Sequence, residues 1–228
     1  MYTPRHFELG ADRAADLLAG ARTAQLVTAH PSGPVATLLP VLHRPGGGLG
    51  TLVFHVTRTN EQWRDTGLGD ALAILSGPDG YVDPDWYASQ AVKHSVPTWN
   101  YVTVHAYGPL VVHDDPEWVR AAVLDLGDRH GYVAGLTEEE WDRQLRPIVG
   151  LEMPIARIEA KAKLNQNRAP EDIAGVIAGL QGVGEDALAS AMAEISLPHA
   201  EARYRLMAQV KAGRRLGEPD ARPGRETG

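Results

Sequence analysis

Hydrophobic residues recur at two different spacings along the chain, and the spacing changes after residue 114. Residues 12–21 place apolar side chains on one face of a predicted helix. Short apolar segments separated by Gly and Pro clusters follow, which is typical of antiparallel strands joined by tight turns. We expect strands at residues 24–30, 35–44, 49–58, 70–78, 80–82 and 95–114, with a bend at Gly108-Pro109.

Helical signals dominate the second half of the chain. Residues 114–131 begin with an aspartate cap and Pro116, and residues 136–149 begin with Thr137 and Glu140 at the spacing of a capping box. A closing strand is predicted at residues 150–164, and helices are predicted at 169–182 and 184–213. The predicted fold class is α+β, an antiparallel barrel of about six or seven strands with inserted and C-terminal helices.

Composition and charge exclude several classes of protein. The hydrophobic content of 43% indicates a globular protein, and no apolar run is long enough to span a membrane. The net charge of -7 repels a phosphate backbone and argues against a nucleic-acid-binding surface. The absence of Cys excludes disulfides, thiolate metal ligands and a cysteine nucleophile. No secretory signal pattern is visible, so we expect a cytoplasmic protein.

The stretch "FHVTRTNEQW" is the first candidate for a ligand site. It contains His55, Arg58 and Asn60, and in an extended strand His55 and Arg58 fall on opposite faces. His and Arg together suit a ligand with anionic groups. The alternative is a half-buried strand with a hydrogen-bonded histidine and a solvated arginine.

The stretch "VPTWNYVTVHAYG" is the second candidate. Alternate positions share one predicted face of the strand, and they are Trp99, Tyr101, Thr103, His105 and Tyr107. Such a face suits either a dimer interface or the wall of a site for a flat-ring cofactor.

The stretch "KAKLNQNR" is the third candidate. Its hydrogen-bond donors include Lys161, Lys163, Gln166 and Asn167, and they precede a predicted helix. Donors at a helix entrance suit phosphate or carboxylate groups, whereas the alternative is a polar loop with Asn caps.

The stretch "GPDGYVDPDWYAS" is the fourth candidate. It places Asp83 and Asp85 on either side of a proline, directly before Trp86 and Tyr87. Two carboxylates beside aromatic rings suit a cationic group. The alternative is turn chemistry, in which the Asp-Pro pair starts a turn and Asp85 caps a short helix.

Together these stretches resemble the PaiB family of FMN-binding regulators. The further matching segments are "MYTPRHF", "LVTAHPSGPVATLLPVL", "IVGLEMPIARIEAKAKLNQNR" and "AGVIAGL", and all of them run in order from Met1 to about Leu180. The resemblance implies an FMN-binding split barrel and a homodimer with cofactor sites at the subunit interface. We therefore expect a split-barrel domain at residues 1–180, a helical extension at 181–212 and a disordered tail at 213–228.

The sequence departs from the family pattern at positions near the implied cofactor site. Leu38 stands where the family commonly has a histidine, and Asp83 and Asp85 replace serines. Added carboxylates oppose a flavin phosphate and favour an ammonium group. One branch of the family, the haem-dependent piperazate synthases, fits this change from an anion-binding to a cation-binding site. Enzymes of that branch use haem b to convert N5-hydroxy-L-ornithine to L-piperazic acid.

In that interpretation His55 is the first choice for the iron ligand and His105 the second, while a lysine, a tyrosine or Met153 stays open. Arg58, Lys161 and Lys163 would hold haem propionates or the substrate carboxylate, and Asn60, Trp99, Gln166 and Asn167 would complete the cofactor site. The haem would act as a Lewis acid on the hydroxylamine. Asp83 or Asp85 would accept the ammonium proton, with Tyr87 beside them. The alternative function is an FMN-binding PaiB-type protein, either a transcriptional regulator or a flavin-dependent redox protein.

Overall fold

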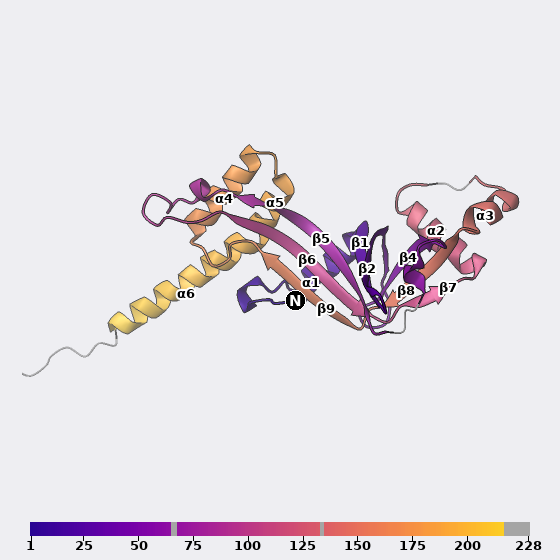
Figure 1. Ribbon diagram of the computed structural model, residues 1–228. Helices are drawn as coiled ribbons and strands as arrows, with labels where there is room; N and C mark the ends of the chain where they lie inside the picture. Colours follow the sequence, from indigo (N-terminus) through magenta and orange to yellow (C-terminus); the bar gives the residue numbers. More distant parts are fainter. Residues whose placement is uncertain (65–67, 133–134, 217–228) are drawn as a thin grey trace, which may run out of the picture. The chain divides into compact units, whose positions relative to one another are not determined.

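A computed structural model describes residues 1–64, 68–132 and 135–216, and its contacts divide the chain into two compact units (Figure 1). Unit 1 contains Met1–Asp79 and Tyr101–Lys163, and unit 2 contains Gly80–Asn100 and Leu164–Gly228. The predicted domain boundary at residue 180 stays a prediction. Residues 213–216 of the predicted tail belong to a helix, and residues 217–228 lie outside the described residues.

Five strands form the larger sheet, and the unit boundaries fall inside two of them, β5 and β6. In spatial order the strands are β2 (Gly33–Pro40), β1 (Thr23–His30), β5 (Ala71–Val82), β6 (Thr98–Gly108) and β9 (Arg157–Lys163). The β1–β2, β1–β5 and β6–β9 pairs are antiparallel.

Four strands form the second sheet, which belongs to unit 1. In spatial order they are β3 (Leu42–Arg44), β4 (Thr51–Thr57), β8 (Ile148–Pro154) and β7 (Val111–His113). Each neighbouring pair is antiparallel.

The described residues thus contain nine strands, and the expectation of about six or seven was wrong. The single strand predicted at residues 150–164 is two strands in different sheets, β8 and β9. Pro154 ends β8 because it has no N–H for the ladder, and Ala156 N then donates to Tyr107 O at 2.8 Å. Conversely, the two strands predicted at 70–78 and 80–82 are one strand, β5.

The helices of unit 1 follow their sequence signals. They are α1 (Ala11–Gly20), α2 (Pro116–Asp128) and α3 (Glu138–Leu145), with 3-10 turns η1 (Arg5–Phe7) and η2 (Glu61–Trp63). Asp115 caps α2 through the backbone N–H groups of Glu117 and Trp118. Thr137 and Glu140 form the predicted capping box at α3. α2 packs on β4 and β8 (Figure 1), so both inserted helices are attached to the four-stranded sheet.

The helices of unit 2 form the C-terminal part of the chain. They are α4 (Pro170–Gly182), α5 (Asp186–Ala191), the π-helical turn η4 (Met192–Ser196) and α6 (Leu197–Leu216). The π-helical turn ends two residues before Pro198, whose missing N–H interrupts a regular α-helical ladder. None of the helices within the described ranges is long and apolar enough to cross a membrane.

The 3-10 turn η3 (Pro84–Trp86) packs against α4 inside unit 2. Two glycines make this close approach possible. A Cβ added at Gly175 would lie 2.2 Å from the carbonyl oxygen of Trp86, and one at Gly179 would lie 2.3 Å from the indole ring. Ser89 continues the attachment, because its N–H and Oγ–H donate to the Asp172 carboxylate at 2.8 and 3.0 Å.

We expect Gly175→Ala to lower the free energy of unfolding by about 2 kcal/mol, because the added methyl group overpacks against backbone. Gly182→Ala is the matched control in the same helix, since a Cβ there meets nothing within 4 Å. That control should be neutral or slightly stabilising. Urea denaturation measures both changes, and equal unfolding midpoints for the two variants would contradict the close contact.

Candidate functional site

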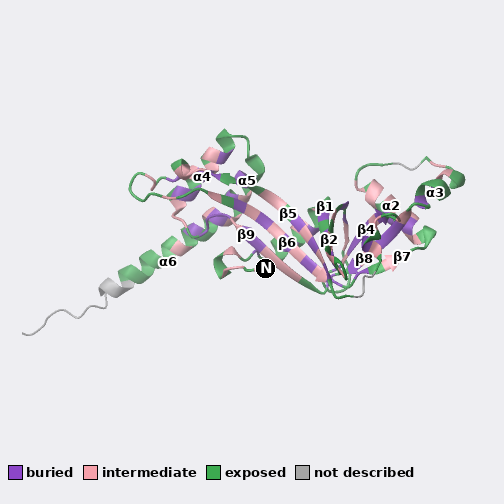
Figure 2. Cartoon of the chain, viewed as in Figure 1, coloured by how far each residue is buried: buried purple, intermediate pink, exposed green. Residues whose placement is uncertain are grey.

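The half-exposed face of β6 carries the aromatic row predicted from the sequence. Along this strand buried residues alternate with half-buried ones (Figure 2). Val102, Val104 and Ala106 face the core, and the opposite face presents Tyr101, Thr103, His105 and Tyr107. The predicted alternation is confirmed. Trp99 belongs to unit 2 and is 52% exposed.

Charged side chains of β9 lie directly across from this row. The antiparallel register pairs Tyr101 with Lys163, Thr103 with Lys161, His105 with Glu159 and Tyr107 with Arg157. Opposite residues in such a register share a face. Arg157 Cζ lies 3.7 Å from the Tyr107 ring centroid, and Lys161 Nζ lies 5.3 Å from that of Tyr101. The face therefore combines flat rings with cations.

The two lysines of this face differ in their surroundings. Lys161 is 9% exposed, and its Nζ donates to the Tyr2 carbonyl oxygen at 3.1 Å. Burial is the main cause that lowers the pKa of Lys163; Tyr101 opposes it, and the neighbouring charge of Lys161 makes a smaller lowering contribution. An anionic ligand group would raise the pKa of Lys163 back toward its ordinary value, because it would stabilise the charged form.

Glu159 lies at the centre of an ionic network on the same face. It accepts hydrogen bonds from the Met1 amino group, from Arg157 and from Tyr107 Oη, the last at 3.1 Å. The Met1 hydrogen bond is the main reason that the pKa of Glu159 is lowered. Burial and the bond to Glu159 raise the pKa of Tyr107. Tyr107 is therefore a neutral donor beside a carboxylate.

Both candidate iron ligands are held in the neutral state. Burial lowers the pKa of His55 in β4. Burial also lowers the pKa of His105 in β6, with a further contribution from the N-terminal charge and an opposing one from Glu159. A neutral imidazole can donate a lone pair to a metal. The two histidines lie in different sheets, and only His105 lies in the aromatic row.

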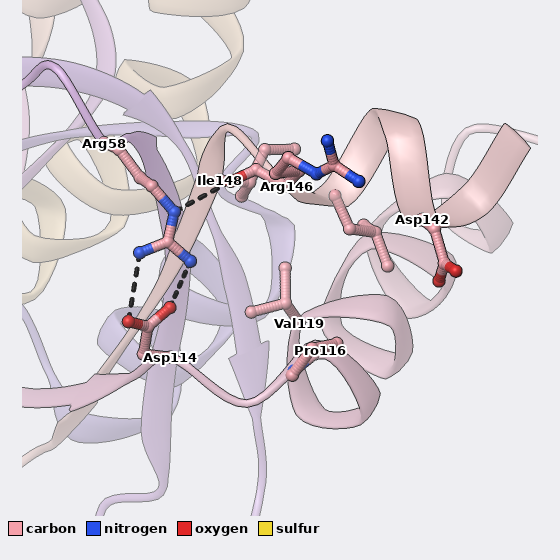
Figure 3. Close-up of a pocket in the computed structure, with 8 residues that line it drawn as sticks. Arg58, Asp114, Pro116, Val119, Asp142, Arg146 and Ile148 are labelled. Atoms are coloured by element: carbon pink, nitrogen blue, oxygen red, sulfur yellow. Dashed lines mark hydrogen bonds and ion pairs between the residues drawn. The ribbon is translucent and has the colours of Figure 1, made fainter. Parts of the chain in front are cut away.

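Arg58 and Asn60 have structural partners at the end of β4. The Arg58 guanidinium binds both carboxylate oxygens of Asp114, and its Nε donates to the Arg146 carbonyl oxygen at 2.7 Å (Figure 3). Asn60 Oδ1 accepts from Gln62 N at 2.9 Å and caps η2, while Nδ2 donates to Thr37 Oγ1 at 3.2 Å. Their predicted roles in binding a cofactor stay predictions.

Asp83 and Asp85 lie in unit 2 and do not share one role. Asp83 caps η3, because its Oδ1 accepts from Asp85 N at 2.9 Å. The alternative in which Asp85 caps a short helix was therefore wrong, because Asp83 is the cap. Asp85 is exposed, and no hydrogen bond of its side chain to another described residue is present. The carboxylate of Asp83 is thus explained by its cap of the turn, whereas no hydrogen bond explains the carboxylate of Asp85.

Tyr87 is buried in unit 2 beside the loop before α4. Its hydroxyl accepts from Asn165 Nδ2 at 3.2 Å, and Arg168 Cζ lies 4.4 Å from its ring centroid. Burial is the main cause of the raised pKa of Tyr87, and the charge of Arg168 opposes it. Gln166 Oε1 accepts from Leu164 N at 2.8 Å within the loop, and Asn167 is exposed.

The predicted site residues are therefore divided between the two units. Unit 1 holds His55, Arg58, Asn60, His105, Lys161 and Lys163, and unit 2 holds Asp83, Asp85, Tyr87, Trp99, Gln166 and Asn167. Sequence reasoning missed Arg157 and Glu159, although charges at every second position of "RIEAKAK" were the available signal. It also missed Asp114, whose partner Arg58 is 56 residues away.

Comparison with known proteins shows the family to which the chain belongs. A family model described as "Putative FMN-binding domain" matches residues 1–157. The chain is also 30% identical over 207 residues to "Protease synthase and sporulation protein PAI 2" of Bacillus subtilis, covering 86% of this chain and 96% of that protein. The chain belongs to the PaiB family. Membership of the PaiB family accounts for the order of the matching segments along the chain.

Solved structures show the same fold at low sequence identity. The FAD and heme binding protein from Mycobacterium smegmatis is 21% identical, with a TM-score of 0.52 over 72% of this chain and 77% of that one. The flavocytochrome Anf3 from Azotobacter vinelandii is 14% identical, with a TM-score of 0.51 over 67% of each chain. The predicted α+β split-barrel fold is confirmed for this PaiB-family chain.

We expect the stability of the protein to fall as the pH drops below about 6.5, the ordinary pKa of an unfolded histidine. The lowered pKa values of His55 and His105 mean that the unfolded chain takes up protons first. In His55→Gln this loss should be smaller. Urea unfolding at about pH 7.5 and about pH 5.5 measures the difference. His94→Gln, which removes an exposed histidine, is the control, and an equal effect of both substitutions would contradict the assignment.

Proposed function

We propose that this PaiB-family protein binds FMN on the half-exposed face of β6 and β9 and uses it as a redox cofactor. The observation that carries the proposal is the register that sets Tyr101 and Tyr107 beside Lys163 and Arg157. Aromatic rings can stack on a flat ring system, and cations can hold a phosphate. A family described by a putative FMN-binding domain supports this choice of cofactor.

The residues present fit the group. Tyr101 and Tyr107 offer half-buried ring surface, and Lys163 carries a charge that an anion would stabilise. Burial disfavours the charged form of Lys163, and a bound phosphate would offset that effect, so Lys163 is our candidate for the phosphate contact. When bound, the flavin would supply electron or hydride transfer. The chain itself would hold the phosphate, orient the ring and keep water from one side of it.

A second copy of the chain is the partner that completes this proposal. The five-stranded sheet leaves its aromatic row half-exposed, and Leu38 of β2 is 65% exposed. Exposed apolar and aromatic groups of this kind are favoured in protein interfaces. We therefore propose a homodimer in which the two copies cover the cofactor together.

A haem-dependent piperazate synthase is the second candidate function. His105 favours it, because a neutral imidazole lies in the same row as the tyrosines. The flavocytochrome and the FAD and heme binding protein add that haem proteins occur with this fold. When bound, haem would supply Lewis-acid chemistry. Asp85, which has no structural reason for its charge, would receive the substrate ammonium and its proton.

We expect Lys163→Gln to weaken FMN binding about tenfold while the affinity for riboflavin, which lacks the phosphate, stays unchanged. Lys93→Gln, at an exposed lysine of unit 2, is the control and should change neither affinity. Flavin fluorescence quenching measures both dissociation constants. Equal weakening for FMN and riboflavin would contradict a phosphate contact.

The visible spectrum of protein reconstituted with either cofactor separates the two functions. Flavin bands with no uptake of haem would support the first proposal and remove the second. A Soret band with no uptake of flavin would do the reverse.

For the haem candidate, we expect Asp83→Asn to keep the turn, since Asn caps as well as Asp, and to leave activity largely unchanged. Asp85→Asn should lower the conversion of N5-hydroxy-L-ornithine about tenfold or more while haem stays bound. Mass spectrometry of the product measures the rate. Full activity in Asp85→Asn would contradict the proton-accepting role.

His105→Ala should change the haem spectrum more than His55→Ala. The opposite order would support His55 as the iron ligand.

A further inference from the structure

A cavity of about 380 Å³ lies in unit 1 beside the inserted helices, away from the aromatic row of β6. Its floor is apolar and is formed by Pro116 and Val119 of α2, Leu145 of α3 and Ile148 of β8. A cavity of this volume is at the small end of the range for ligand pockets, so it fits a small metabolite rather than a nucleotide.

Four charged side chains surround this floor, and their formal charges cancel. They are Arg58, Arg146, Asp114 and Asp142. Arg58 and Asp114 satisfy each other through two hydrogen bonds. The cavity therefore has no net charge to attract a phosphate or a simple cation, but it has separated charges of both signs.

Asp142 and Arg146 are the charges left for a ligand. Asp142 lies in α3 and Arg146 is the C-cap residue four positions later, a spacing that makes them neighbours on the helix surface. Both side chains are labelled in Figure 3. Within the described residues, neither side chain makes a hydrogen bond or an ion pair. Asp142 makes a minor contribution to the raised pKa of Arg120. Both terminal nitrogens of Arg120, however, bind Glu138, at 2.6 and 2.9 Å.

We propose that this cavity binds a free α-amino acid with an apolar side chain. The ligand carboxylate pairs with Arg146, the ammonium group pairs with Asp142, and the side chain covers the floor at Val119 and Leu145. In Figure 3 the side chain of Val119 lies between Asp114 and Asp142, which is where an apolar ligand group would be placed.

This inference goes beyond the proposed function, since no residue of the aromatic row lines the cavity. The ligand class follows from the arrangement of charge. A zwitterion matches one free cation and one free anion, whereas a carboxylic acid or an amine alone leaves one of them unpaired. Charge-assisted hydrogen bonds to the carboxylate and to the ammonium group distinguish an amino acid from a carboxylic acid or an amine. The apolar floor favours a hydrocarbon side chain.

The test is titration of the full-length chain with L-leucine, followed by two-dimensional amide NMR. We expect shifts of α2 and α3 amide signals, and about tenfold weaker binding of L-leucinamide and of N-acetyl-L-leucine, each of which lacks one charge. Arg146→Gln and Asp142→Asn should each weaken leucine binding about tenfold. Both changes are at exposed positions, so the fold should be retained, and thermal unfolding checks this.

Matched controls are Arg143→Gln and Glu139→Gln, which remove exposed charges of α3 that do not line the cavity. They should leave leucine binding unchanged. No amide shift at about 10 mM leucine would overturn the proposal, and so would equal binding by all four variants. Equal weakening in the controls would assign the effect to general charge and also overturn it. The flavin or haem spectrum is an independent measurement, so this proposal and the proposed function can fail separately.

Discussion

The antiparallel pairing of β6 with β9 is the interaction on which the candidate site depends. Side chains alternate between the two faces of a strand, so the register decides which residues meet on the half-exposed face. With Tyr107 opposite Arg157 and Tyr101 opposite Lys163, rings and cations share a surface. A slip of one residue would turn the rings into the core and bring valines to the surface. The same ladder thus stabilises the fold and specifies the site.

Charge on this surface is controlled by burial and by partners within unit 1. Lys161 donates a hydrogen bond to a backbone carbonyl oxygen. The charged form of Lys163 is disfavoured by burial and, to a lesser extent, by the charge of Lys161. Glu159 is surrounded by donors and stays ionised. Bound anions would therefore be directed toward one end of the row rather than spread along it. At the four-stranded sheet, Asp114 plays the part of such a partner, because its carboxylate accepts two hydrogen bonds from the guanidinium of Arg58.

Local signals could be predicted from the sequence, and long-range pairings could not. The caps of α2 and α3 and the alternation along β6 depend on neighbours within a few residues, and the structure agrees with them. The split of residues 150–164 depends on which sheet each half joins, and no short pattern contains that information. Arg58 was a reasonable anion-binding candidate by residue type, but its partner Asp114 comes from a distant segment. Asp83 and Asp85 look equivalent in sequence, and only the backbone direction of η3 distinguishes them.

The packing of Trp86 on the glycines of α4 has a consequence for the order in which the chain can fold. Glycine is a poor helix former, and α4 contains Gly175 and Gly179 within its interior. The face of α4 that carries these glycines packs against η3, which the ribosome makes roughly ninety residues earlier. During synthesis the segment Gly80–Asn100 has to wait, without its partner, until the chain beyond Leu164 has emerged. Unit 2 can therefore complete its packing only after the C-terminal part of the chain has been made.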